Sequence, residues 1–209
     1  MPSQQHELLA HCAHAFEHKL ATLDEALDPS HLGALPREWV LLGQVGNERL
    51  RHRIAARLAR TVVAPWPRLT DLLQREARLA LLDRGAILNQ LCLLALAGRP
   101  GVVRCCLRRE PREALRSALG PAFDALSAAG GRAVEDEVAQ WSPLEWACMG
   151  YLDWLELLGS NDPALGRLVS LSLPAGLLSM PQRRDDAPAE RSPREALNLL
   201  QELDLEWSC

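Results

Sequence analysis

The seven residues from Leu91 to Ala97 are apolar on every side of a helix, and this constrains the fold more than any other feature of the chain. A helix that is apolar all round has no side for solvent, so other elements must pack around it. The uncharged run that contains it, from Gly85 to Gly98, has 14 residues and is too short for the roughly 20 residues of a membrane-spanning helix. The sequence Gly98-Arg99-Pro100-Gly101 then ends the helix. We therefore expect a buried central helix inside a larger helical domain.

Helix signals recur along most of the chain, and strand signals are almost absent. Apolar residues at helical spacing predict helices over 4–27, 47–62, 70–97 (with a kink or close packing at Gly85), 102–109, 112–119 and 122–129. Two capping boxes with proline at the first helical position, Ser142 to Glu145 and Ser192 to Glu195, predict helices over 143–158 and from 193 onward. The expected fold class is all-α: a single compact multi-helix domain with irregular loops and a C-terminal amphipathic helix.

Composition divides the chain into a main part and a C-terminal piece. Residues 1–181 are expected to form the helical domain, and 182–193, which are charged and contain proline, to form a linker-like loop. Residues 194–209 are expected to form the terminal helix. Its apolar face either docks on the main domain or is presented to a partner, and the sequence favours docking. That face carries Ala196, Leu199, Leu200, Leu203 and Trp207.

Charge is distributed unevenly over the 209 residues, although 48% apolar and 24% charged residues are globular values. Residues 1–48 carry 2 basic and 7 acidic side chains, 49–116 carry 15 and 5, and 117–209 carry 6 and 15. A basic block thus lies between two acidic ones, and it can be compensated internally or offered to partners of either sign. The N-terminal residues do not have the pattern of a secretory signal, so the expected location is cytoplasmic.

No residue pattern indicates catalysis, a metal or a cofactor. His6 and His11 are spaced one residue too far apart for a zinc protease motif, and His14 and His18 have a metal-pair spacing without further ligands nearby. The sequence has no phosphate-binding glycine loop and no nucleophile elbow. The cysteines show no C-x-x-C pair. Cys92, Cys105 and Cys148 lie in apolar surroundings, where a thiol behaves as a small hydrophobe, and one thiol of the adjacent Cys105-Cys106 pair is expected off the core face. We expect no catalytic residues, no cofactor and no metal site, and therefore no enzyme.

Arginines form two groups in the basic block. One group, Arg49, Arg53, Arg57 and Arg60, makes a stripe beside the apolar positions Leu50, Ile54 and Leu58 of a predicted helix. The other follows the central helix and consists of Arg104, Arg108, Arg109, Arg112 and Arg116. Arginine pairs with carboxylate or phosphate, so nucleic acid remains an alternative. The pI of about 5.9 and the scarcity of aromatics among these arginines favour acidic protein surfaces instead.

The stretch from Leu79 to Leu126 resembles the K subunit (SctK type) of bacterial type III secretion systems. The resemblance rests on Leu79 to Leu82, the turn from Gly98 to Arg104, and the segment from Ala114 to Gly120. A weaker echo is the sequence Asp28-Pro29-Ser30-His31-Leu32. The resemblance covers about a third of the chain, and its motifs concern packing and not chemistry.

This resemblance implies a mostly helical, non-enzymatic adaptor of the cytoplasmic sorting platform. It would link the cytoplasmic domain of the inner-membrane ring protein (SctD type) to the pod protein (SctQ type). The adaptor would lie at the inner-membrane face without inserting into the membrane, and no nucleic acid would be bound. The alternatives are a type III secretion chaperone and an arginine-rich helical DNA-binding regulator, whose affinity would depend steeply on salt.

Two charged clusters are the predicted partner-binding residues of such an adaptor. Charged patches select a partner and set its register, while a small apolar patch supplies affinity. The acidic cluster stands at a probable helix start, where carboxylates also interact favourably with the helix dipole. The predicted contacts are Arg104, Arg108, Arg109 and Arg112 in the basic cluster, and Glu135, Asp136 and Glu137 in the acidic cluster.

Overall fold

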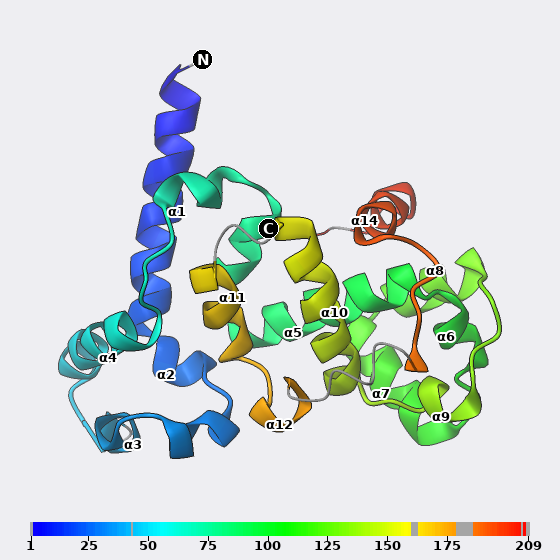
Figure 1. Ribbon diagram of the computed structural model, residues 1–209, viewed down its shortest axis with the longest axis horizontal. Helices are drawn as coiled ribbons and strands as arrows, with labels where there is room; N and C mark the ends of the chain where they lie inside the picture. Colours follow the sequence, from blue (N-terminus) through cyan, green and yellow to red (C-terminus); the bar gives the residue numbers. More distant parts are fainter. Residues whose placement is uncertain (1, 43, 160–162, 179–185, 206, 208–209) are drawn as a thin grey trace. The chain divides into compact units, whose positions relative to one another are not determined.

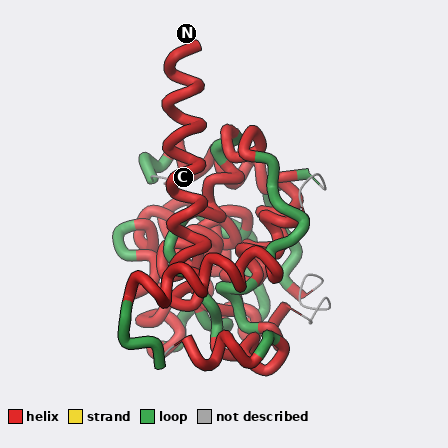
Figure 2. The backbone as a smooth tube through the Cα atoms, turned by 90° about the vertical axis from the view of Figure 1, so that its left-hand side faces the viewer, coloured by secondary structure: helices red, strands yellow, loops and turns green. Residues whose placement is uncertain are grey.

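The protein is all-α in the part that the structure describes, as the sequence predicts. The computed structural model describes residues 2–42, 44–159, 163–178, 186–205 and 207. Every regular element in these ranges is an α-helix or a short 3-10 helix, joined by loops (Figure 2). Within the same ranges, no helix is both long and apolar enough to cross a membrane.

The described residues form two compact units, and the chain passes from the first to the second within helix α5 (Arg84–Gly98) and again within helix α12 (Ala175–Leu178). The first unit contains residues 2–87 and 163–176, and the second contains residues 88–159 and those described from 177 onward. The boundary predicted at 181/182 lies outside the described residues. Helix α12 spans the division between residues 176 and 177.

The first unit is built around helix α1, the long blue helix of Figure 1, with α4 in cyan against it. Phe16 and Leu20 of α1 are buried, and Asn47 caps α4 by accepting the backbone N–H of Leu50 at 3.0 Å. Its elements are α1 (Pro2–Ala21), α2 (Leu23–Ala26), η1 (Pro29–Ala34), α3 (Arg37–Leu42), α4 (Glu48–Val62), η2 (Leu69–Leu73), η3 (Glu76–Leu81) and α11 (Pro163–Ser170).

Asp28 connects three segments of the first unit. Its buried carboxylate accepts hydrogen bonds from the N–H and hydroxyl of Ser30 and, at 2.5 Å, from Arg84 Nη2. Burial raises the pKa of Asp28, but the Ser30 hydrogen bonds and the Arg84 and His31 charges outweigh it, so that the pKa lies below its usual value. Arg84 also donates to the carbonyl of Ser172 at 3.1 Å. The segment that carries the weaker sequence echo therefore has a packing role.

One helix prediction is wrong. The helix expected over 70–97 is instead two 3-10 helices followed by α5 (Arg84–Gly98), because the Asp83 side chain accepts the N–H of Ala86 at 2.8 Å and starts a new helix.

The buried positions of α4 are Ala55 and Ala59, each 0% exposed. These small side chains let α1 approach closely. In the apolar row of α4, Leu50 is 49% exposed, while Ile54 and Leu58 are half-buried.

The second unit surrounds the apolar helix α5. All residues from Leu91 to Pro100 are buried, which confirms the prediction for Leu91 to Ala97. At Gly150 helix α10 comes so close to α5 that an added Cβ would lie 1.8 Å from the carbonyl oxygen of Leu91, which only glycine permits. The other elements of the unit are α6 (Gly101–Cys105), α7 (Arg109–Leu119), α8 (Ala122–Ala129), α9 (Asp136–Ala139), α10 (Pro143–Leu158) and α14 (Pro193–Glu202).

The C-terminal helix α14 packs against α10 and buries Ala196 and Leu200. Both predicted capping boxes are present, at Ser142 and at Ser192. Helix α14 ends at Glu202, short of the predicted residue 209, and Asp204 has a positive φ of 54°. Of the predicted linker-like loop, 182–185 lie outside the described residues. In its described part the N–H groups of Glu190 and Arg191 donate to the Gly98 carbonyl at 2.9 and 3.2 Å, so this part is anchored.

Arg99 connects the segments that meet where α5 ends. Its guanidinium is 2% exposed and forms two hydrogen bonds with Asp153 of α10, at 2.6 and 3.3 Å. It also donates to the carbonyls of Ala187 at 2.7 Å and Ala95 at 3.1 Å. A buried guanidinium needs such a set of partners because desolvation of an unpaired charge is costly. One side chain therefore joins α5, α10 and the segment before α14.

Replacing Asp153 by alanine should destabilise the protein by about 3 to 5 kcal/mol, because Arg99 would stay buried without its counter-charge. Urea unfolding followed by circular dichroism measures this loss. The double variant Arg99→Met/Asp153→Leu removes both charges and should recover most of the stability. A loss below about 1 kcal/mol for Asp153→Ala would contradict the role given to the pair.

Candidate protein-binding surface

The structure brings the two predicted charged clusters together in the second unit. The basic cluster lies at the end of α6 and the start of α7, and the acidic cluster lies at the start of α9, which packs against α6. Arg108 Nη2 and Asp136 Oδ2 are 3.3 Å apart, and both side chains are about two thirds exposed. We call this region the Leu107 surface, which comprises Arg104, Leu107, Arg108, Arg109, Glu135, Asp136 and Glu137.

The four predicted arginines have different surroundings. Arg104 is exposed and makes no ion pair with any described residue, and Arg109 pairs along α7 with Glu113 at 2.8 Å. Arg112 faces inward instead: it donates to the carbonyl of Cys106 at 3.3 Å and lies 5.4 Å from the centre of the Phe123 ring. Cation–π contact and partial burial give Arg112 a packing role. Of the four arginines, Arg104, Arg108 and Arg109 are therefore the ones presented to solvent.

Arg116, the remaining arginine of this group, contacts the same ring, although its side chain is 51% exposed. Its guanidinium lies 4.8 Å from the centre of the Phe123 ring and pairs with Asp124 at 3.0 Å. Phe123 itself is 0% exposed. Arg112 and Arg116 therefore lie over the same buried ring and fix α7 on α8.

The acidic cluster is placed as the sequence predicts, at a helix start. Glu135 occupies the position before α9 and makes no side-chain capping bond, while Asp136 and Glu137 lie in the first turn. All three side chains are exposed. The carboxylates therefore interact favourably with the backbone N–H groups there and remain open to a partner.

Leu107 is the residue of this surface that sequence reasoning missed. It is 78% exposed, the highest value among the large hydrophobic side chains of the described ranges. The sequence predicts a helix through residue 109, but α6 ends at Cys105 and the buried Cys106 leaves the helical conformation with ψ 84°. This turn points Leu107 outward, and no periodicity in the sequence signals it.

Chemically, the Leu107 surface is suited to binding a protein. An exposed leucine loses unfavourable hydration when a partner covers it. An exposed ion pair such as Arg108 with Asp136 contributes only about 0 to 1 kcal/mol to the free energy of unfolding. A partner can therefore replace this ion pair with its own charges at a small cost in free energy. Cations on one side and carboxylates on the other can then fix the partner's orientation.

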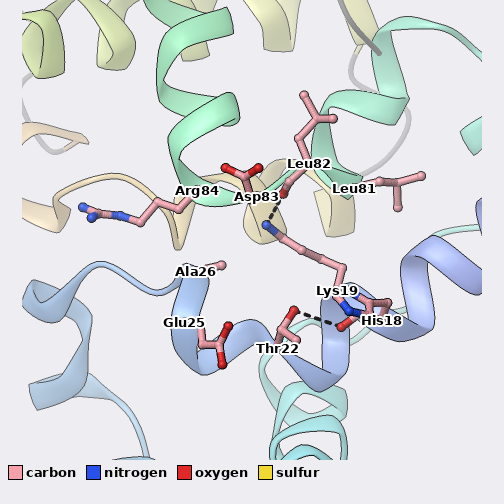
Figure 3. Close-up of a pocket in the computed structure, with 9 residues that line it drawn as sticks. All are labelled: His18, Lys19, Thr22, Glu25, Ala26, Leu81, Leu82, Asp83 and Arg84. Atoms are coloured by element: carbon pink, nitrogen blue, oxygen red, sulfur yellow. Dashed lines mark hydrogen bonds between the residues drawn. The ribbon is translucent and has the colours of Figure 1, made fainter. Parts of the chain in front are cut away.

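A separate pocket in the first unit holds the only lysine of the sequence. It has a volume of about 240 Å³ and is lined by His18, Lys19, Thr22, Glu25, Ala26 and Leu81 to Arg84 (Figure 3). Lys19 is 3% exposed and donates to the Leu82 carbonyl, which ties α1 to the end of η3. Burial lowers its pKa to about 8, although the charge of Asp83 acts in the opposite direction. We interpret Lys19 as a packing residue.

The predicted His14 and His18 pair is exposed on α1. Among the residues that the structure describes, no three or more His, Cys, Asp or Glu side chains are grouped closely enough to hold a metal ion.

Comparison of the chain with models of protein families, with curated proteins and with solved structures finds no match.

The lowered pKa of Lys19 predicts how stability depends on pH. Between the folded pKa of about 8 and the usual value of 10.5, the unfolded chain binds a proton that the folded chain does not. Lys19 should therefore make the free energy of unfolding rise with pH over this range, by up to about 3 kcal/mol.

The variant Lys19→Met isolates this contribution, since it keeps an unbranched side chain without the amine. Wild-type minus variant unfolding free energies, from urea titrations at several pH values, should increase from pH 8 to 10.5. Thiols such as Cys92, whose pKa burial raises to about 12, titrate in both proteins and cancel in the difference. A difference that stays constant would contradict the assignment.

Proposed function

We propose that this protein is a non-enzymatic cytoplasmic adaptor of the type III secretion sorting platform. In this role it links the cytoplasmic domain of the inner-membrane ring protein (SctD type) to the pod protein (SctQ type). The observation that carries the proposal is the Leu107 surface, where a leucine that is 78% exposed lies beside arginines and near carboxylates. Binding, and not turnover, is the chemistry that such a surface supports.

The sequence resemblance covers Leu107 and the arginines of the Leu107 surface. Residues 79–126, which resemble the SctK type, extend from the end of η3 into α8 and include Arg104, Leu107, Arg108 and Arg109. The apolar residues of this stretch form the buried helix α5, and its polar residues reach the surface after the break. The stretch therefore combines a packing role with an exposed contact region, as an adaptor needs.

The Leu107 surface favours a protein partner over nucleic acid. Arg108 and Arg109 each pair with a carboxylate, and Asp136 with its two acidic neighbours would repel a phosphate backbone. A protein partner can supply both signs of charge together with an apolar contact for Leu107. A secretion chaperone would bind an unfolded or helical client instead, and it remains the alternative within the same secretion system.

Replacing Leu107 by aspartate should weaken binding to at least one of the two partners by about tenfold or more, because it puts a charge where the apolar contact forms. Titration calorimetry with the purified ring-protein domain and pod protein measures the affinity. Arg68→Glu, a charge reversal at an exposed arginine of the first unit, is the control and should bind normally. Unchanged affinity for Leu107→Asp would remove this surface from the proposal.

A charge swap gives a second test of the same surface. Arg108→Asp with Asp136→Arg keeps an ion pair at this place, so the unfolding free energy should change by less than about 1 kcal/mol. Binding should nevertheless fall, since each charge then meets a partner charge of the wrong sign. If the swapped protein bound as tightly as wild type, the charges would not contribute to recognition.

A further inference from the structure

We infer that the outward face of α4 binds an acidic amphipathic helix of a partner protein. This face lies in the first unit and is separate from the Leu107 surface, and the inference does not depend on the proposed function. We call it the α4 face, which consists of Leu50, Arg53, Ile54, Arg57, Leu58 and Thr61. These residues line a shallow groove of about 390 Å³ along one side of the helix.

The packing of α4 explains why this face is unoccupied by the chain itself. Ala55 and Ala59 face the core, and Arg51 pairs with Asp24 and Glu25 around α2. At 100° per residue, Leu50 and Arg57 lie on the side of the helix opposite the two alanines. Leu50 is 49% exposed, which is unusual for a leucine in the apolar row of an amphipathic helix.

Helix α3, which packs against α4, also exposes two apolar side chains, Val40 at 56% and Leu41 at 52%. Single exposed apolar residues are common on protein surfaces, so the inference rests on the row of α4 itself.

The positive charge of the α4 face indicates an acidic partner. Arg53 and Arg57 are exposed and have no carboxylate within ion-pairing distance among the described residues. Arg49, also exposed and without such a carboxylate, continues the row toward the start of α4. A row of unpaired arginines beside a row of leucine and isoleucine is complementary to a helix with carboxylates beside its own apolar row.

The length of the α4 face suits a helix as the partner. The residues of the α4 face follow one another at intervals of three, one, three, one and three, the pattern of one helical face. From Leu50 to Thr61 the face is about 16 Å long, which corresponds to three turns of a partner helix. Nucleic acid would pair with the arginines but would leave the apolar row without a partner, since protein–DNA interfaces are more polar.

The first experiment uses a synthetic 18-residue peptide as the probe. It carries leucines at i, i+3, i+4 and i+7 beside glutamates at i, i+4 spacing, and a control peptide has the same composition with the two rows scrambled. Fluorescence anisotropy with the full chain should show saturable binding of the first peptide, with at least tenfold weaker binding of the scrambled one. Equal affinity for both peptides, or no binding of either, would overturn the inference.

Variants then locate the site. Arg53→Glu/Arg57→Glu should weaken peptide binding at least tenfold, and Leu50→Ser/Leu58→Ser should do the same, while circular dichroism shows the helix content retained. Leu107→Asp should leave peptide binding unchanged, because this substitution alters the Leu107 surface and not the α4 face. Loss of peptide binding in Leu107→Asp, or its persistence in both α4 variants, would overturn the assignment to α4.

The same protein preparation tests two competing occupants of the α4 face, nucleic acid and a second copy of the chain. A 20-base-pair DNA duplex should bind more weakly than the peptide at 150 mM salt, and sedimentation should show no self-association that the Leu50→Ser/Leu58→Ser variant abolishes. Tighter binding of DNA with a steep salt dependence would assign the arginines to nucleic acid instead. Self-association lost in that variant would assign the face to a second copy of the chain.

Discussion

A buried positive charge has to be neutralised inside the protein, and the second unit is organised by the way Arg99 meets this requirement. The guanidinium donates hydrogen bonds to both carboxylate oxygens of Asp153 and to two backbone carbonyls. Its position therefore holds α5, α10 and the segment before α14 together. Removal of the pair would disturb the route of the chain from the buried helix to α6. That route determines where Leu107 and the arginines after it emerge, and therefore the position of the proposed binding surface depends on this pair.

The all-α class and most helices follow from local sequence signals. The capping boxes at Ser142 and Ser192 form as predicted, and the uniformly apolar residues from Leu91 to Ala97 are buried. Such signals act within one turn of the chain, so a single sequence suffices to detect them. The juxtaposition of the basic and acidic clusters, in contrast, depends on the packing of α6 against α9 and had no local signal.

Three features could not be predicted, and each has a physical reason. The helix expected over 70–97 is interrupted because Asp83 caps a new helix and the preceding carbonyl is taken by Lys19, which is 63 residues distant in sequence. Leu50 of the apolar row of α4 is exposed, and Ile54 and Leu58 are only half-buried, because a smaller pair, Ala55 and Ala59, gives closer packing. Leu107 is exposed because α6 ends early. In each case a tertiary contact or a backbone turn outweighs a periodic pattern.

The proposed adaptor role requires that both partners bind to this protein at the same time. The measurement is size-exclusion chromatography with light scattering on the full chain mixed with the ring protein's cytoplasmic domain and the pod protein of the same secretion system. We expect a single complex that contains all three proteins. Without this chain, the two partners should not form a complex with each other. Two mutually exclusive binary complexes, or no complex with either partner, would contradict the adaptor role.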